Sequence, residues 1–232
     1  QAIALKPNYA EAYSNLGNTL KELGKLKDAE ASHAQAIELK PSVAEAHNNL
    51  GNTLKELGRL EEAEASYTRA IRLKPDFAKA HSNLGNMLKD LGRIDEAEAS
   101  YRQAIKLEAG YAEAHNNLGI TLQEQGRLEE AESSYRQAIK LQVDYAEAYN
   151  NIGNTFQKMD SLDQALKAYK NAIKTKLDYA EAHFNIGITL VNLGQLKEAK
   201  KALNAALCNK HDYACLLYTS DAADEGLGVD LG

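Results

Sequence analysis

Residues 10–43 read AEAYSNLGNTLKELGKLKDAEASHAQAIELKPSV, and residues 44–77 read AEAHNNLGNTLKELGRLEEAEASYTRAIRLKPDF. The two stretches agree at most positions, and the same frame begins again at Ala78, Ala112, Ala146 and Ala180. Self-similarity at a fixed period of 34 residues is the signature of a helical repeat array, in which each repeat is one supersecondary unit. The period therefore decides the fold before any single motif is considered.

This frame divides the chain into three parts. Residues 1–9 are interpreted as the end of a truncated repeat, so the natural N-terminus is expected to lie upstream. Six repeats follow at 10–43, 44–77, 78–111, 112–145, 146–179 and 180–213. Residues 214–232 form a tail that does not continue the pattern.

Each repeat carries two apolar stripes at helical spacing. In the first repeat, Tyr13, Leu16 and Leu20 lie on the first stripe, and Gly24 follows where a helix end needs left-handed backbone geometry. Pro41 follows the second stripe and stops that helix. The pattern predicts two antiparallel helices joined by a tight turn. A single hairpin cannot bury both stripes, so the repeats must stack into a solenoid.

Capping boxes are expected where each first helix begins. In the segment Ser42–Glu45, Ser42 is the predicted N-cap and Glu45 is predicted to reach back to it. Asp takes the place of Ser in the segments Asp144–Glu147 and Asp178–Glu181.

The pattern Tyr13-x-x-Leu16-Gly17-x-x-Leu20…Ala29-x-x-x-His33…Pro41 resembles the tetratricopeptide repeat. The resemblance covers residues 1–213. It implies an all-α fold, a right-handed superhelical solenoid of antiparallel helix hairpins whose first helices line a concave groove. It also implies a non-catalytic scaffold that binds peptides or proteins there. The sequence departs from the pattern at the late Pro, replaced by Ala109, Val143, Leu177 and His211, and at the turn Gly, replaced by Asp160.

One polar residue recurs in every repeat. Counting the first Ala of a repeat as position 1, position 6 is always Asn: Asn15, Asn49, Asn83, Asn117, Asn151 and Asn185. A carboxamide both donates and accepts hydrogen bonds, so a row of six could hold the backbone of an extended peptide independently of its side chains. The alternative is that each Asn bonds only to its neighbours within the solenoid. Position 9 adds a weaker secondary row, Asn18, Asn52, Asn86 and Asn154, interrupted by Ile120 and Ile188.

The asparagine row is also similar to the superhelix of O-linked N-acetylglucosamine transferases, in segments such as AYSNLGNTLKELG and AHSNLGNMLKDLG. In that family the matching asparagines hold the substrate peptide. The resemblance implies an alternative function, the substrate-recognition arm of a glycosyltransferase-like enzyme whose catalytic domain is missing from this chain. A third hypothesis is a structural spacer or a self-associating stack, because exposed terminal repeats can pair.

Four recurring histidines, His47, His81, His115 and His183, could suggest a metal site. They stand one repeat apart, too far to share one ion, and Tyr13 and Tyr149 replace them in the other repeats, so we expect packing residues. Core packing is likewise expected for the second-helix tyrosines, Tyr67, Tyr101, Tyr135 and Tyr169. The sequence contains no phosphate-binding loop, zinc-protease motif or nucleophile elbow, so no cofactor, metal or catalytic residue is assigned.

Composition narrows the class of partner. The formal net charge is −6, and residues 215–232 contribute four acidic and no basic residues. The repeats are nearly neutral and carry no basic patch, which argues against nucleic acid and anionic membrane as partners. Only two cysteines occur, and no apolar run is long enough to span a membrane, so the cytoplasm is the compartment expected by default.

The tail is interpreted as artefactual. The stretch CLLYTSDAADE at residues 215–225 resembles a translated sequencing adapter, and GVDLG at 228–232 continues that resemblance after a short variable segment. The alternative is a polar cap on the last repeat. We expect the tail to carry no function.

Overall fold

The computed structural model describes residues 9–210, with side chains as far as Cys208. Within that range it contains twelve α-helices and no strand, so the predicted all-α helical-repeat fold is confirmed. The predicted truncated repeat at the start of the chain, apart from Tyr9, and the tail lie outside the described residues.

The helices alternate between a shorter first helix and a longer second helix in each repeat. The first helices are α2 (Ala10–Glu22), α4 (Ala44–Glu56), α6 (Ala78–Asp90), α8 (Ala112–Glu124), α10 (Ala146–Lys158) and α12 (Ala180–Asn192). The second helices are α3 (Leu26–Leu39), α5 (Leu60–Leu73), α7 (Ile94–Leu107), α9 (Leu128–Leu141), α11 (Leu162–Thr175) and α13 (Leu196–Lys210).

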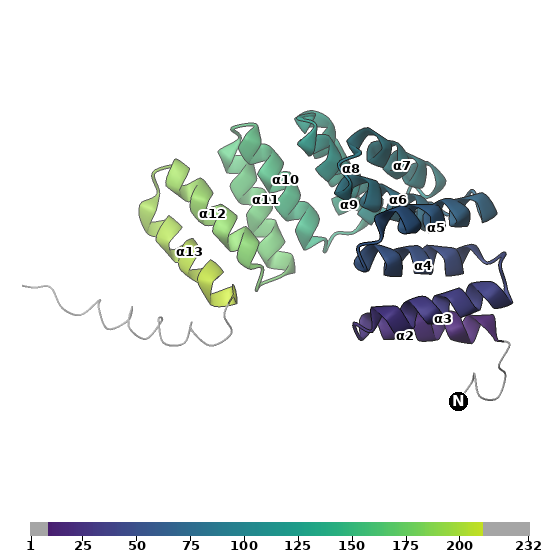
Figure 1. Ribbon diagram of the computed structural model, residues 1–232. Helices are drawn as coiled ribbons and strands as arrows, with labels where there is room; N and C mark the ends of the chain where they lie inside the picture. The colour runs from purple at the N-terminus through teal and green to yellow at the C-terminus, as the bar shows by residue number, and fades with distance from the viewer. Residues whose placement is uncertain (1–8, 211–232) are drawn as a thin grey trace, which may run out of the picture. The chain divides into compact units, whose positions relative to one another are not determined.

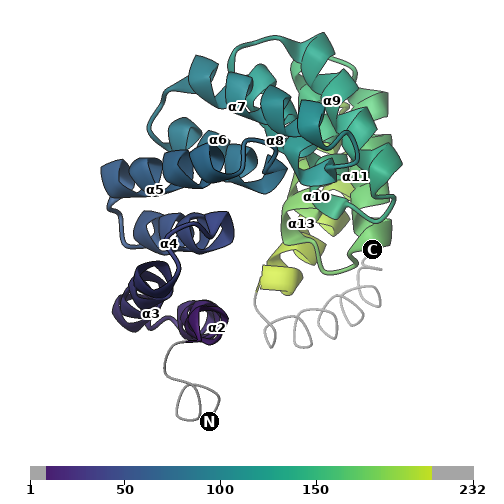
Figure 2. The same cartoon turned by 90° about the vertical axis from the view of Figure 1, so that its right-hand side faces the viewer.

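The chain divides into two compact blocks, residues 1–121 and 122–232, with the division inside α8. In the N-terminal block, α2–α7 form three successive hairpins, in which each first helix packs on its own second helix, α2 packs on α4, and α4 packs on α6 (Figures 1 and 2). In the C-terminal block, α10 packs on α9, α11 and α12, and α12 packs on α13. The first helices α2, α4 and α6 are therefore consecutive neighbours in one block, as are α10 and α12 in the other.

A glycine with positive φ forms the turn in every described hairpin except that of α10 and α11. The turn glycines, such as Gly58, have φ angles between 72° and 76°, the left-handed region in which a side chain is disfavoured. The N–H of Gly58 donates to the carbonyl of Lys55, and the N–H of Arg59 donates to the carbonyl of Leu54, at 3.0 and 2.9 Å. These bonds satisfy the last carbonyls of α4 and reverse the chain.

Asp160 takes the place of this glycine in the fifth repeat without changing the turn. Its φ is 58°, and the N–H groups of Asp160 and Ser161 donate to the carbonyls of Gln157 and Phe156 in the same pattern. Replacing the turn glycine by Asp160 therefore changes neither the conformation of the turn nor the hydrogen bonds that end α10. A non-glycine residue in this conformation costs about 1 kcal/mol or more.

Asp160→Gly is accordingly expected to stabilise the protein by about 0.5–1 kcal/mol, since glycine's greater freedom in the unfolded chain offsets part of the relieved strain. The shift in the urea unfolding midpoint measures it. The reciprocal control, Gly126→Asp in the preceding repeat, should destabilise by a similar amount. A midpoint that moves in the same direction for both variants would contradict the strain argument.

The predicted capping boxes are wrong. The helices begin one residue later than the motif requires, so Val43, Tyr145 and Tyr179 are the N-caps, and none of them makes a side-chain cap hydrogen bond. Glu45 is consequently the second residue of α4 rather than the third. Its Oε1 instead accepts a hydrogen bond from Lys74 Nζ of α5 at 3.0 Å.

In the hairpins α2–α3, α4–α5, α6–α7 and α10–α11 a ring of the second helix lies against a glycine of the first, and Leu203 takes the place of the ring against Gly187. Tyr67, Tyr101, Tyr135 and Tyr169 are at most 1% exposed, which confirms the prediction that they are core rings. A Cβ atom on Gly51 would lie 2.7 Å from Cε1 of Tyr67, so only glycine allows the ring to sit against the backbone of α4. Ala63, fully buried in α5, keeps the facing surface of the second helix small.

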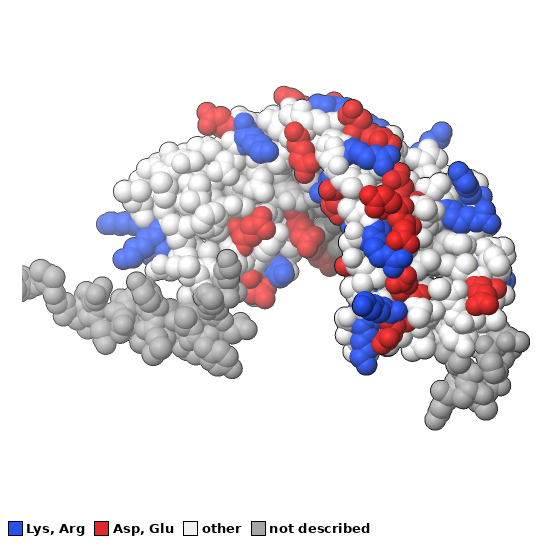
Figure 3. Space-filling model, viewed as in Figure 1, with Lys and Arg blue, Asp and Glu red and all other residues white. Residues whose placement is uncertain are grey.

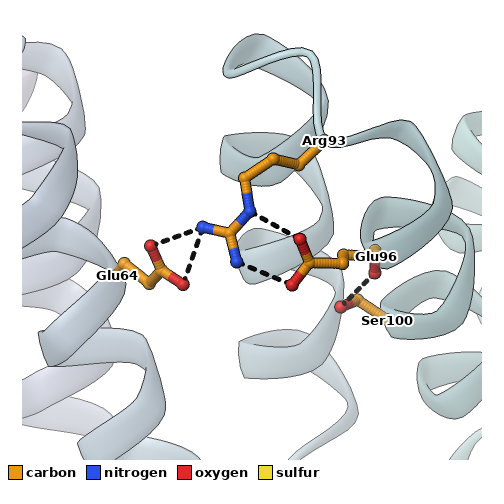
Figure 4. A network of polar contacts seen from close by, with 4 residues as sticks. All are labelled: Glu64, Arg93, Glu96 and Ser100. Carbon is orange, nitrogen blue, oxygen red and sulfur yellow. Dashed lines mark hydrogen bonds and ion pairs between the residues drawn. The ribbon is translucent and has the colours of Figure 1, made fainter.

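Arginine forks connect neighbouring hairpins at their turn ends (Figure 4). Arg93 donates through Nε and Nη2 to Glu96 at 2.7 and 2.6 Å, and through Nη1 to Glu64 of the preceding repeat at 2.9 and 2.8 Å. Arg59 joins Glu62 and Glu30 in the same way. The Arg93 guanidinium holds the pKa of Glu96 below its usual value. Acidic and basic side chains alternate along this edge of the N-terminal block (Figure 3).

Candidate functional site

The asparagines of position 6 each lie in the first helix of a repeat, from α2 to α12. Asn15 is exposed, and Asn49, Asn83, Asn117, Asn151 and Asn185 are half-buried. Partial burial means that each side chain contacts protein on one side and leaves the other side to solvent. The hydrogen bonds show which amide atom faces which way.

The Nδ2 atoms of four of these asparagines donate hydrogen bonds to the preceding repeat. Asn83 donates to Asn48 Oδ1 at 2.9 Å, one repeat back in α4. Asn49 donates to Ser14 at 3.4 Å and Asn185 to Asn150 at 3.0 Å in the same way. Asn117 and Asn185 also donate to position 9 of the preceding repeat, to Asn86 at 3.0 Å and Asn154 at 3.1 Å. The sequence left open that each Asn bonds only to its neighbours within the solenoid. The Nδ2 groups of Asn49, Asn83, Asn117 and Asn185 do bond in this way.

The Oδ1 atoms of the same side chains differ in their hydrogen bonding. Those of Asn49, Asn83 and Asn185 accept no hydrogen bond from any residue that the structure describes. Oδ1 of Asn117 has only a long contact of 3.4 Å with Asn116 Nδ2. A half-buried carbonyl oxygen with its donor group anchored is a preset hydrogen-bond acceptor.

The secondary row has the opposite arrangement. Oδ1 of Asn52, Asn86 and Asn154 accepts the hydroxyl of the core tyrosine in its own hairpin: Tyr67 at 2.8 Å, Tyr101 at 2.7 Å and Tyr169 at 2.8 Å. Their Nδ2 groups donate to none of the described residues, so these asparagines present donors. The two rows together offer acceptors and donors side by side.

Sequence reasoning missed this tyrosine–asparagine pair, although a signal was present. The repeats with a position-9 Asn and a tyrosine 15 residues later form the bond. Where Ile120 replaces the asparagine, the Tyr135 hydroxyl reaches only Gln123 Oε1, at 3.5 Å. In the first repeat His33 takes the place of the tyrosine, and neither of its ring nitrogens makes a hydrogen bond in the described structure.

Two cavities of the N-terminal block are lined by the predicted asparagines. One of about 230 Å³ is lined by Asn52, Asn83 and Asn86 together with Lys21, Lys55, Glu56 and Tyr67. The other, about 580 Å³, includes Asn15, Asn18 and Asn49 among its lining residues. The ion pair between Lys21 Nζ and Glu56 Oε1, 2.9 Å, lies at the first of these cavities.

The recurring histidines are tied to the loops between repeats. Nε2 of each ring is 3.0–3.3 Å from a carbonyl oxygen six residues earlier: His47 to Pro41, His81 to Pro75, His115 to Ala109 and His183 to Leu177. Because a carbonyl only accepts, Nε2 carries the proton. Among the described residues, no group of three or more His, Cys, Asp or Glu side chains could hold a metal ion. Nor does any described helix have the length and apolarity to cross a membrane.

Comparisons with known proteins agree with this architecture. The family model described as the cilia and flagella-associated protein 70 C-terminal domain, a tetratricopeptide model, matches residues 10–216. No curated protein matches the sequence. The crystal structure of MamA is similar at 26% identity and a TM-score of 0.65, covering 71% of this chain and 96% of that one.

Two further solved structures are informative. YrrB, described as a TPR protein with an unusual peptide-binding site, is 27% identical with a TM-score of 0.59, covering 78% of this chain and 93% of that one. PilF of Pseudomonas aeruginosa, at 20% identity, covers 93% of this chain and 97% of that one with a TM-score of 0.77, and supports the fold alone.

Proposed function

Since the chain belongs to the tetratricopeptide-repeat family of the cilia and flagella-associated protein 70 C-terminal domain, we propose that it is a non-catalytic scaffold that binds an extended peptide segment of a partner protein. The contact surface is the asparagine row of the first helices. The observation that carries the proposal is that Asn49, Asn83 and Asn185 each have an anchored Nδ2 and an Oδ1 without a described partner. The peptide-binding site named for YrrB supports the same class of function.

The chemistry of the row favours recognition of a peptide backbone. An extended peptide presents N–H and C=O groups at regular intervals, and the Oδ1 of Asn49 and Asn83 would accept from its N–H groups. The Nδ2 of Asn52 and Asn86 would donate to its C=O groups. Each such bond contributes about 0.5–1.5 kcal/mol, so several in a row give useful affinity without side-chain selectivity.

The test uses a fluorescent, unstructured peptide of about 15 Gly, Ser and Thr residues, compared with the same peptide N-methylated along its backbone. Replacing Asn49, Asn83 and Asn117 together with Ala is expected to weaken binding of the unmodified peptide at least tenfold, from the summed loss of about three hydrogen bonds. The N-methylated peptide, which lacks backbone donors, should bind as weakly to the natural chain. Fluorescence anisotropy measures both.

Asn48→Ala is the matched control. It breaks the hydrogen bond to Asn83 from its buried side, since Asn48 is 1% exposed, and leaves the Oδ1 of Asn83 in place. It should cost stability and weaken binding less than the triple variant does, because Asn83 keeps its acceptor and loses only the rotamer that Asn48 selects. Equal losses for Asn48→Ala and the triple variant, or undiminished binding of the N-methylated peptide, would show that the amides serve only the stack.

The alternative from the sequence, a recognition arm of an O-linked N-acetylglucosamine transferase-like enzyme, uses the same row and needs a catalytic domain encoded beyond this chain. Sequencing the gene on both sides tests it, and also tests the adapter origin of residues 214–232. We also propose that the six repeats span residues 10–213 and that the protein is cytoplasmic. Its partner is proposed to be a protein or peptide rather than nucleic acid or membrane.

A further inference from the structure

The second helix of the fifth repeat, α11, differs in charge from the second helices before it. Position 19 is acidic in the other five repeats and is Gln164 here, and position 21 is Glu in the first four repeats and is Leu166 here. Position 22, which is Ala or Ser in the first four repeats, is Lys167. As a result α11 carries three lysines and one aspartate, whereas α5, α7 and α9 each carry three acidic and two basic residues.

Two of these changed residues, Gln164 and Lys167, line a cavity of about 320 Å³ where α9, α10 and α11 meet. Its apolar lining comes mainly from α10, which packs on both other helices. Ile152 and Phe156 of that helix line the cavity and are 4% and 5% exposed. Phe156 is itself a departure, because position 11 is Leu in the other five repeats. Three departures of one repeat therefore meet at one cavity.

The exposed lining residues make the cavity electropositive. They include Arg136, Gln164 and Lys167, and no acidic residue is among the described residues that line it. The guanidinium carbon of Arg136 lies 5.8 Å from the centre of the Phe156 ring, and Arg136 pairs with Glu132 at 2.8 Å. Lys167, by contrast, makes no ion pair with any residue that the structure describes. An apolar surface thus adjoins a cation without a counter-charge.

This cavity and the asparagine row lie on opposite sides of α10. Tyr149, Ile152 and Phe156 all line the cavity and are spaced i, i+3 and i+7, so they share one side of the helix. At about 100° per residue, Asn151 and Asn154 lie on the other side. A ligand in the cavity would therefore leave the asparagine row accessible.

We propose that this cavity binds a short acidic segment of a partner protein, in which an apolar side chain such as Phe or Leu is next to Asp or Glu. The apolar side chain would be buried against Ile152 and Phe156, and the carboxylate would pair with Lys167. The amides of Gln164 and Asn171, which also line the cavity, can bond the backbone of the segment.

Size and charge favour this occupant. The volume is near the lower end of the range for ligand pockets, which suits one large side chain and its neighbour rather than a cofactor. Because an exposed ion pair alone contributes little, the buried side chain supplies most of the affinity and Lys167 selects the acidic neighbour. This second contact goes beyond the backbone recognition proposed for the asparagine row.

The probe is a short fluorescent Gly/Ser peptide with a central Phe between two Asp residues. The variant Gln164→Glu/Lys167→Ser gives α11 the residues that α9 has at the same positions. It is expected to weaken binding of the probe at least about tenfold, because a cation is lost and a carboxylate is gained at the cavity. A probe with Asn in place of Asp should bind the natural chain more weakly and should not distinguish it from the variant. Fluorescence anisotropy measures each affinity.

Lys170→Glu is the matched control, since it changes the charge of α11 by the same amount at a residue that does not line the cavity. All three substituted positions are exposed, and circular dichroism establishes that the variants fold. Equal weakening by Lys170→Glu would show that the overall charge of the helix attracts the probe, and would overturn the proposal. An unchanged affinity of the double variant, or failure of the natural chain to bind the probe, would also overturn it.

Two other occupants are outcomes of the same titration. The chain's own tail carries Asp221, Asp224, Glu225 and Asp230, and replacing all four with the matching amides should leave probe binding unchanged. A marked gain in affinity would make the tail the occupant and overturn the proposal. Binding of a short single-stranded oligonucleotide that displaces the probe, and that Gln164→Glu/Lys167→Ser abolishes, would make a nucleic acid the occupant and overturn it as well.

Discussion

Replacing Tyr67 with Ala is expected to lower the free energy of unfolding by about 3–5 kcal/mol, the usual cost of truncating a fully buried aromatic side chain. The ring is 0% exposed and lies against Gly51, so its removal leaves a void between α4 and α5 that small neighbours cannot fill. Urea unfolding followed by circular dichroism measures the loss. Because repeat arrays can unfold in parts, the comparison should include the slope as well as the midpoint of the transition.

Tyr67→Phe separates packing from polarity. It keeps the ring and removes the hydroxyl that donates to Asn52 Oδ1, so the expected loss is about 1 kcal/mol. If Tyr67→Phe cost as much as Tyr67→Ala, the hydrogen bond rather than the packed ring would hold the hairpin together.

Acidification is expected to destabilise the protein through His33, the histidine that replaces the core tyrosine in the first repeat. The ring is 0% exposed, and neither of its nitrogens has a hydrogen-bond partner in the described structure. Burial, with a smaller contribution from the charge of Lys21, lowers the pKa of His33 to about 4. The ordinary value in an unfolded chain is about 6.5.

Between these two pKa values the unfolded chain binds a proton that the folded protein does not. Stability is therefore full above about pH 6.5, falls by up to about 1.4 kcal/mol per pH unit as the pH decreases, and levels off below about pH 4. His33→Tyr should remove this pH dependence and raise stability at every pH, because a tyrosine can reach Asn18 as Tyr67 reaches Asn52. Melting curves at pH 7.5 and 5 test the difference. Parallel losses in both proteins would mean that other groups, such as the arginine-paired glutamates, dominate the acid response.

The repeat frame, the hairpins and the buried tyrosines could be predicted because each depends on residues close together in one repeat. Gly24 and its equivalents mark left-handed turns by residue type alone, and Asp160 shows that the surrounding turn tolerates a substitute. The capping boxes failed by one residue, because the first helical turn begins at Ala44 rather than at Val43.

The direction of each asparagine amide could not be predicted in the same way. Asn83 and Asn185 are oriented by acceptors 31 to 35 residues away in sequence, in the preceding repeat. The pattern of one repeat contains no information about which atom faces its neighbour. The departures at Phe156, Gln164 and Lys167 are visible in the sequence, but that they line one cavity depends on how α9, α10 and α11 pack.

The anchoring of Asn83 by Asn48 has an energetic consequence for any ligand. A free asparagine on a surface samples several rotamers, and a ligand that immobilises it must offset the lost conformational entropy. Here the rotamer is already selected when the helices stack. The array is thus preorganised, and loosening the contact between two neighbouring repeats should raise the entropic cost of binding even where no contacting residue has changed.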